Sequence, residues 1–119
     1  MTLEKVKEKA DRYFTKAVEI RRYLHQNPEL SFQEENTANY VFDTLKSMGL
    51  KPQRMAETGV VALIEGAHPG PVVALRADLD ALPILEANDV QYKSKNDGVM
   101  HACGHDGHTA IGIGLALKF

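Results

Sequence analysis

The chain has 119 residues, of which 44% are hydrophobic and 25% are charged, and its net charge is −2. These values are typical of a soluble globular protein with one domain and one modest core. Acidic and basic residues are interspersed and no apolar run reaches the ~18 residues of a membrane span, so we expect neither a nucleic-acid partner nor a membrane partner. The N-terminus also lacks the pattern of a signal peptide, which predicts a cytoplasmic protein.

Two amphipathic helices are predicted in the first half of the chain. Apolar residues recur at three-and-four spacing between Leu3 and Leu24, and the Asn27-Pro28 pair predicts the end of that helix. Ser31 and Glu34 have the spacing of a capping box for a second helix, which Gly49 would close.

The next segment predicts strands followed by a long loop. Short apolar runs cover residues 60–64 and 72–75, with turn-forming residues between them, and a third strand is expected near residues 53–56. Residues 81–100 show no clean period and are predicted to be mostly loop. Together with the helices, these elements indicate an α/β layer arrangement in which helices pack on a small mixed sheet.

Residues 109–119 favour a helix that is apolar on every side. Such a helix needs cover on all faces, and the chain stops at Phe119 without another element to supply it. The pattern therefore predicts that further sequence belongs to the fold. It also predicts that the chain self-associates as a homo-oligomer through the uncovered surface.

Residues 101–108 read His-Ala-Cys-Gly-His-Asp-Gly-His and carry three of the five histidines beside the single cysteine. Imidazole and thiolate bind divalent metals, and Cys103 and His105 would point the same way in extended backbone. We therefore predict that Cys103 and His105 are metal ligands. The alternatives are a buried structural cysteine with surface histidines, or a redox-active thiol.

Asp78 and Asp80 follow the predicted strand 72–75 directly. In extended backbone both would face one side, where they could contact metal ions or hold the tautomer of a metal-bound histidine. The alternative is that they are turn or capping residues. His25, in the corner between the first two helices, is interpreted as structural because it lacks neighbouring donor residues.

Three motifs in this order resemble the metal-dependent amidohydrolases. They are His25-x-x-Pro28-Glu29-Leu30, the Arg-Ala-Asp-Leu-Asp-Ala-Leu-Pro run at 76–83, and the run at 101–108. The family includes bacterial aminoacylases, hippurate hydrolases and indole-acetyl-amino-acid hydrolases, and is related to zinc carboxypeptidases. The resemblance implies a zinc-peptidase-like catalytic domain that hydrolyses the amide bond of N-acyl amino acids or small peptides.

The resemblance also implies two divalent metal ions per site, manganese or zinc, with cobalt or nickel as alternatives. Cys103 and His105 would be ligands, and Asp78 or Asp80 the aspartate that supports the centre; the pattern does not decide between the two. Members of the family are longer than residues 1–119 and place their glutamate base and dimerisation domain downstream. The chain is therefore expected to be the N-terminal part of the catalytic domain, truncated and inactive alone. A non-catalytic metal-binding or interaction module is the alternative.

Overall fold

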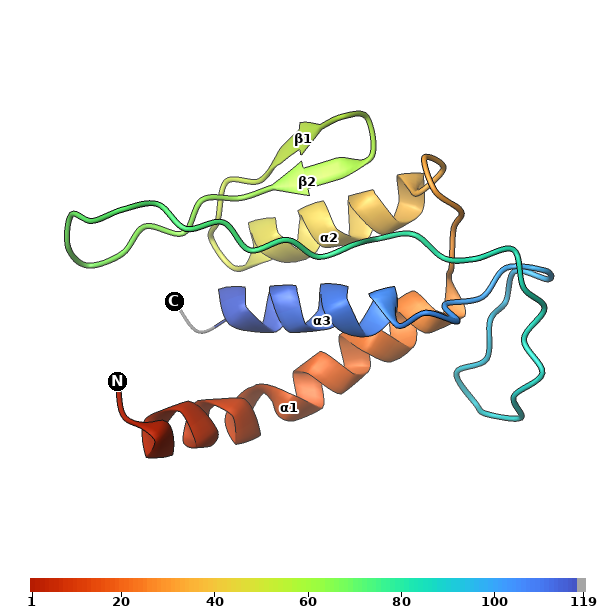
Figure 1. The fold of residues 1–119 in the computed structure, drawn as a ribbon, viewed down its shortest axis with the longest axis horizontal. Helices are drawn as coiled ribbons and strands as arrows, with labels where there is room; N and C mark the ends of the chain where they lie inside the picture. Colours follow the sequence, from red (N-terminus) through yellow and green to blue (C-terminus); the bar gives the residue numbers. More distant parts are fainter. Residues whose placement is uncertain (118–119) are drawn as a thin grey trace.

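The computed structural model describes residues 1–117 and contains three helices that pack with a two-stranded sheet (Figure 1). The predicted α/β arrangement of helices on a small sheet is therefore confirmed. The sheet is antiparallel, with Gln53 opposite Val61, where a mixed sheet was expected. The elements in chain order are α1 (Leu3–Gln26), α2 (Glu35–Ser47), β1 (Gln53–Met55), β2 (Gly59–Val61) and α3 (His105–Ala116).

The core lies where the three helices meet. Only the second half of α1 contributes to it: Ile20 and Leu24 are buried, whereas Leu3 and Phe14 in the first half are 69% and 68% exposed. The predicted apolar stripe of α1 is thus longer than the face that the fold covers. The buried cluster consists of Ile20, Leu24, Val41, Leu45, Ala110, Ile113 and Ala116.

The N-terminus of α2 differs from the prediction. Ser31 does not cap it; the N-cap is Glu34, whose side chain makes no capping hydrogen bond. The Glu29 side chain, from the preceding corner, bonds the first N–H groups of the helix instead. Its Oε1 accepts a hydrogen bond from the Thr37 backbone N–H at 2.6 Å, and its Oε2 accepts one from the Asn36 backbone N–H at 3.2 Å. A carboxylate here stabilises the otherwise unpaired N–H groups and the positive end of the helix. The predicted end is confirmed: Gly49 follows α2 with a φ of +85°.

The strands also pair differently from the prediction. β2 pairs with the expected third strand at 53–55 through a short hairpin, so the turn at residues 66–70 does not join paired strands. Residues 72–75 form no strand within the described chain, and Val72 and Val73 are 84% and 88% exposed. The segment is paired with no strand within residues 1–117.

Helix α3 begins four residues before the predicted start at Thr109, and Lys118 and Phe119 lie outside the described residues. Ala110 and Ile113 are buried, whereas Ile111 is 62% exposed, so its apolar surface is covered on one side only. The extended segment lies along α3 in Figure 1, and a Cβ added to Gly112 would lie 3.5 Å from the Cβ of Ala77. None of the helices described is long and apolar enough to cross a membrane.

Residues 81–100 are mostly loop, as predicted. One isolated bridge, between Leu30 and Ala81, holds this loop to the rest of the fold, and a second, between Leu82 and Met100, joins the two ends of the loop. The Lys95 N–H also donates to the carbonyl of Gln26 at 2.9 Å. The loop is therefore closed at its own ends and attached to the end of α1 and to the corner that follows it.

Candidate metal site

The turn before α3 decides how the predicted metal ligands lie. Gly104 has a φ of +114°, a left-handed conformation that favours glycine, and α3 begins at the next residue. His105 and His108 therefore lie three apart on a helix, where side chains are neighbours, and their ring centroids are 5.5 Å apart. The extended backbone assumed for residues 103–105 is not found. Cys103 lies before the helix and is exposed.

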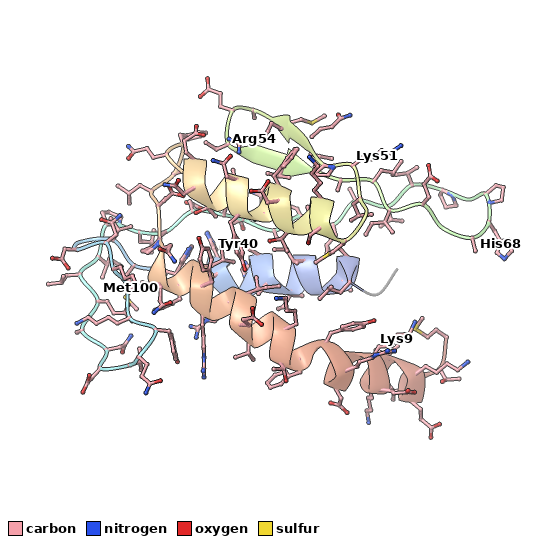
Figure 2. All side chains as sticks on the ribbon, turned by 180° about the vertical axis from the view of Figure 1, so that it is seen from behind. Lys9, Tyr40, Lys51, Arg54, His68 and Met100 are labelled. Atoms are coloured by element: carbon pink, nitrogen blue, oxygen red, sulfur yellow. The ribbon has the colours of Figure 1, made fainter. Side chains whose placement is uncertain are left out.

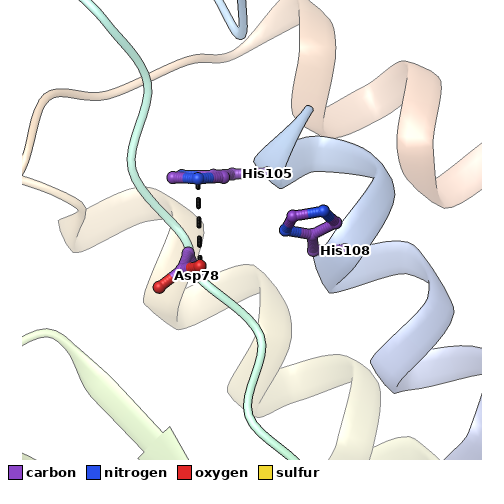
Figure 3. A group of neighbouring side chains, drawn as sticks. All are labelled: Asp78, His105 and His108. Atoms are coloured by element: carbon purple, nitrogen blue, oxygen red, sulfur yellow. Dashed lines mark ion pairs between the residues drawn. The ribbon is translucent and has the colours of Figure 1, made fainter. Parts of the chain in front are cut away.

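The extended segment before the long loop brings both predicted aspartates to His105. The Nδ1 of His105 lies 2.9 Å from Oδ1 of Asp80 and 3.0 Å from the Asp80 carbonyl oxygen. The Nε2 on the other side of the ring lies 3.8 Å from Oδ2 of Asp78 (Figure 3). The Thr109 hydroxyl donates to the Asp78 carbonyl at 2.7 Å, which ties this segment to α3.

These contacts fix the tautomer of His105. A carboxylate oxygen only accepts hydrogen bonds, so the Nδ1 of His105 donates to Asp80. In a neutral imidazole the Nε2 then has a free lone pair, and this is the atom that faces Asp78. A histidine held by a carboxylate through one nitrogen, with the other nitrogen bare, is a common arrangement of metal-binding histidines.

Asp78, His105 and His108 form a group with the chemistry of a divalent metal site. Each offers one ligand atom, and these atoms all lie within 4.8 Å of one another. The second oxygen of Asp78 is engaged by Arg76 at 2.6 Å. Two imidazoles and a carboxylate are ligands that zinc and manganese accept. The sequence did not single out His108; its position three residues after His105 became informative only once the start of α3 was known.

A third histidine of the motif is buried next to this group. His101 is 5% exposed, and neither of its ring nitrogens has a hydrogen-bond partner within residues 1–117. Burial lowers the pKa of His101, while the nearby charge of Asp106 raises it, and burial is the larger effect. A neutral imidazole with an unused lone pair fits a site built for a cation.

A second cluster of charged side chains lies buried beside the turn. The Nδ1 of His25 lies 2.8 Å from Oδ2 of Asp106, and its Nε2 lies 2.9 Å from Oε2 of Glu86. The Nε of Arg21 contacts the same Asp106 oxygen at 2.8 Å. His25, Glu86 and Asp106 are each at most 3% exposed. The interpretation of His25 as structural agrees with this placement, but neither acidic partner was singled out from the sequence.

Comparison with known proteins places these motifs in a family. Residues 74–118, which contain Asp78, Asp80, Cys103 and His105, match the peptidase family M20/M25/M40. An N-acyl-L-amino acid amidohydrolase from Geobacillus stearothermophilus is 54% identical over 120 residues, which is 100% of this chain and 32% of the relative. The chain is similar to members of the M20/M25/M40 peptidase family, and its residues 74–118 match the family itself. The resemblance read from the three motifs is thereby confirmed.

Two further relatives agree with this assignment. Thermostable carboxypeptidase 2 from Saccharolobus solfataricus is 50% identical over 101 residues, covering 83% of this chain and 26% of the relative. The crystal structure of the Bacillus subtilis YXEP protein, a dinuclear metal-binding M20 peptidase, superposes with a TM-score of 0.86 at 45% identity. That match covers 91% of this chain and 31% of the YXEP chain. The chain thus spans about a third or less of the length of these relatives.

Proposed function

We propose that this chain carries part of the metal site of an amidohydrolase that cleaves N-acyl amino acids or small peptides. The observation that carries the proposal is the fixed His105 ring, with Nδ1 on Asp80 and Nε2 facing Asp78. The names and folds of the relatives support the reaction class. Residues 1–119 would then form the N-terminal part of the catalytic domain.

The residues of this chain divide into ligands and a supporting group. His105, Asp78 and His108 would hold a divalent ion, and exposed Cys103 would join them as a thiolate ligand. Asp80 would orient His105 and keep the hydrogen on its Nδ1, so that Nε2 stays available. Of the two aspartates, Asp80 is thus proposed as the residue that supports His105, and Asp78 as a metal ligand.

The metal would supply Lewis-acid chemistry and activate water near neutral pH. Manganese or zinc, with cobalt or nickel as alternatives, are the ions this donor set accepts, and the dinuclear YXEP relative supports two ions per site. The substrate would be a small N-acyl amino acid or peptide. A chain that spans about a third of its relatives is proposed to hold metal without turnover.

Hydrolysis assays test this function. We expect residues 1–119 not to hydrolyse N-acetyl-methionine or hippurate with any of the four metals. If a longer reading frame contains these residues, its product should hydrolyse at least one of the two substrates. In that longer protein, His105→Ala should abolish turnover, whereas His68→Ala, in an exposed loop, should leave it unchanged. A longer protein that binds metal but cleaves neither substrate would favour the non-catalytic metal-binding module. Full activity of its His105→Ala variant would contradict the site.

We also propose that the chain self-associates through the exposed apolar side chains along the extended segment and α3. Val73 is 88% exposed, Leu75 68% and Ile111 62%, and an apolar patch of this kind marks an interface. Sedimentation equilibrium should show a mass that rises with concentration and falls in Val73→Lys. The control, Val6→Lys, changes an exposed residue of α1 and should associate like the wild type. A wild-type monomer at all concentrations would contradict this proposal.

A further inference from the structure

The buried charged cluster connects three segments that are distant in the sequence. Arg21 and His25 come from the end of α1, Glu86 from the long loop, and Asp106 from the first turn of α3. The contact between His25 and Asp106 spans 81 residues, and that between His25 and Glu86 spans 61 residues. The cluster therefore fixes how α1, the loop and α3 meet.

The charges in this cluster are balanced. Each ring nitrogen of His25 faces a carboxylate oxygen, and carboxylates only accept, so His25 donates from both nitrogens as an imidazolium does. Together with Arg21 it offsets the two carboxylates. A buried ion cluster adds little stability compared with apolar residues of the same volume, and its best-attested use is to specify one geometry.

The geometry that it specifies is the start of α3. The N-cap residue of α3 is Gly104, which has no side chain to cap the helix. Instead, Oδ1 of Asp106 accepts a hydrogen bond from the Gly107 N–H at 2.9 Å. Its Oδ2 contacts both Arg21 and His25. Asp106 is thus held from two sides. Its neighbour His105 is held separately by Asp80. Adjacent residues of one helical turn are therefore anchored to two different parts of the fold.

We propose that Asp106, held by His25 and Arg21, is a positioning residue for the metal site. It sets the backbone of the first turn of α3, so that the ring of His105 reaches Asp80 with Nδ1 and presents Nε2 to Asp78. This inference rests on the proposed function. It adds that the affinity for metal depends on a charged cluster that contributes no ligand itself.

Zinc titration of the 119-residue chain tests the inference. Asp106→Asn should lower the zinc affinity about 10–100-fold, the loss typical of removing a partner that orients a metal ligand. Leu45→Ala is the control, because it removes buried side-chain atoms of α2 from the core. It should leave the zinc affinity unchanged. Both variants are compared at temperatures where circular dichroism shows that they are folded. Without metal, long-range ¹H–¹⁵N spectra should show the His105 hydrogen on Nδ1 in the wild type and distributed over both nitrogens in Asp106→Asn.

A milder variant keeps the test decisive if Asp106→Asn does not fold. Arg21→Gln removes one partner of Asp106, and the Arg21 side chain is 38% exposed. This variant should also lower the zinc affinity and distribute the His105 hydrogen over both nitrogens, but to a smaller extent than Asp106→Asn. Wild-type affinity and tautomer in the folded variants, or an equal loss in Leu45→Ala, would overturn the inference while leaving the metal site intact. If the wild type binds no zinc, the proposed function fails, and the tautomer spectra still report on the positioning.

Discussion

Replacing Glu86 with alanine is expected to lower the free energy of unfolding by about 3–5 kcal/mol at pH 7, because it leaves buried His25 with one carboxylate partner fewer. Glu86 also accepts from the Ser94 backbone N–H at 2.7 Å and from the Asn88 amide at 3.1 Å. The alanine variant would therefore leave the buried Nε2 of His25 and two part-buried donors without this partner. Urea denaturation followed by circular dichroism measures the loss.

The same residue predicts how stability depends on acid. Burial raises the pKa of Glu86, but hydrogen bonds from His25, Ser94 and Asn88 outweigh it and lower the pKa from 4.5 to about 2. The folded state therefore binds this proton less readily than the unfolded chain. The contribution of Glu86 is fully present above pH 4.5 and is lost as the pH falls towards about 2. Glu86→Gln should flatten the stability profile in this range.

An exposed glutamate provides the control for both measurements. Glu65 lies on the surface, and Glu65→Ala should change the stability by no more than about 0.5 kcal/mol. A loss of stability in Glu86→Ala that is no greater than in Glu65→Ala would contradict the account of the buried cluster. So would parallel acid profiles of the wild type and Glu86→Gln.

Local patterns predicted the helices well and the ends of elements less well. Three-and-four spacing located α1 and α2, because that period is a property of each segment alone. The start of α2 could not be found in this way, since its first N–H groups are bonded by the Glu29 side chain, which reaches Asn36 and Thr37 across a turn. Pairing of the segment 72–75 was likewise predicted from residue types, whereas a strand also requires hydrogen bonds to a neighbouring strand, and within the described chain none is paired with it.

The candidate site was predicted in its residue types but not in its geometry. The density of histidine near Cys103 and the spacing of Asp78 and Asp80 are visible in the sequence. That His105 contacts both aspartates depends on packing between segments 25 residues or more apart. The pairing of His25 with Glu86 and Asp106 had no local signal, because nothing near His25 in the sequence indicates which acidic residues will be buried beside it.

The second large effect is the loss of metal binding when His105 is replaced. His105→Ala removes the Nε2 that faces Asp78 and leaves Asp80 without the ring it orients, so the zinc affinity should fall by at least about 10–100-fold. His68→Ala is the matched control, since Figure 2 shows His68 in a loop at the opposite end of the molecule from Met100, which lies just before the metal-binding segment. The affinity of the wild type should fall as the pH drops through the titration range of histidine, because ligands bind in the deprotonated form.

Calorimetric titration of zinc and manganese into the wild type, His105→Ala and His68→Ala at pH 7 tests the metal site most directly. We expect saturable binding by the wild type and His68→Ala, and little or none by His105→Ala. Equal affinity in all three proteins, or no binding by the wild type, would contradict the assignment of a metal site to Asp78, His105 and His108.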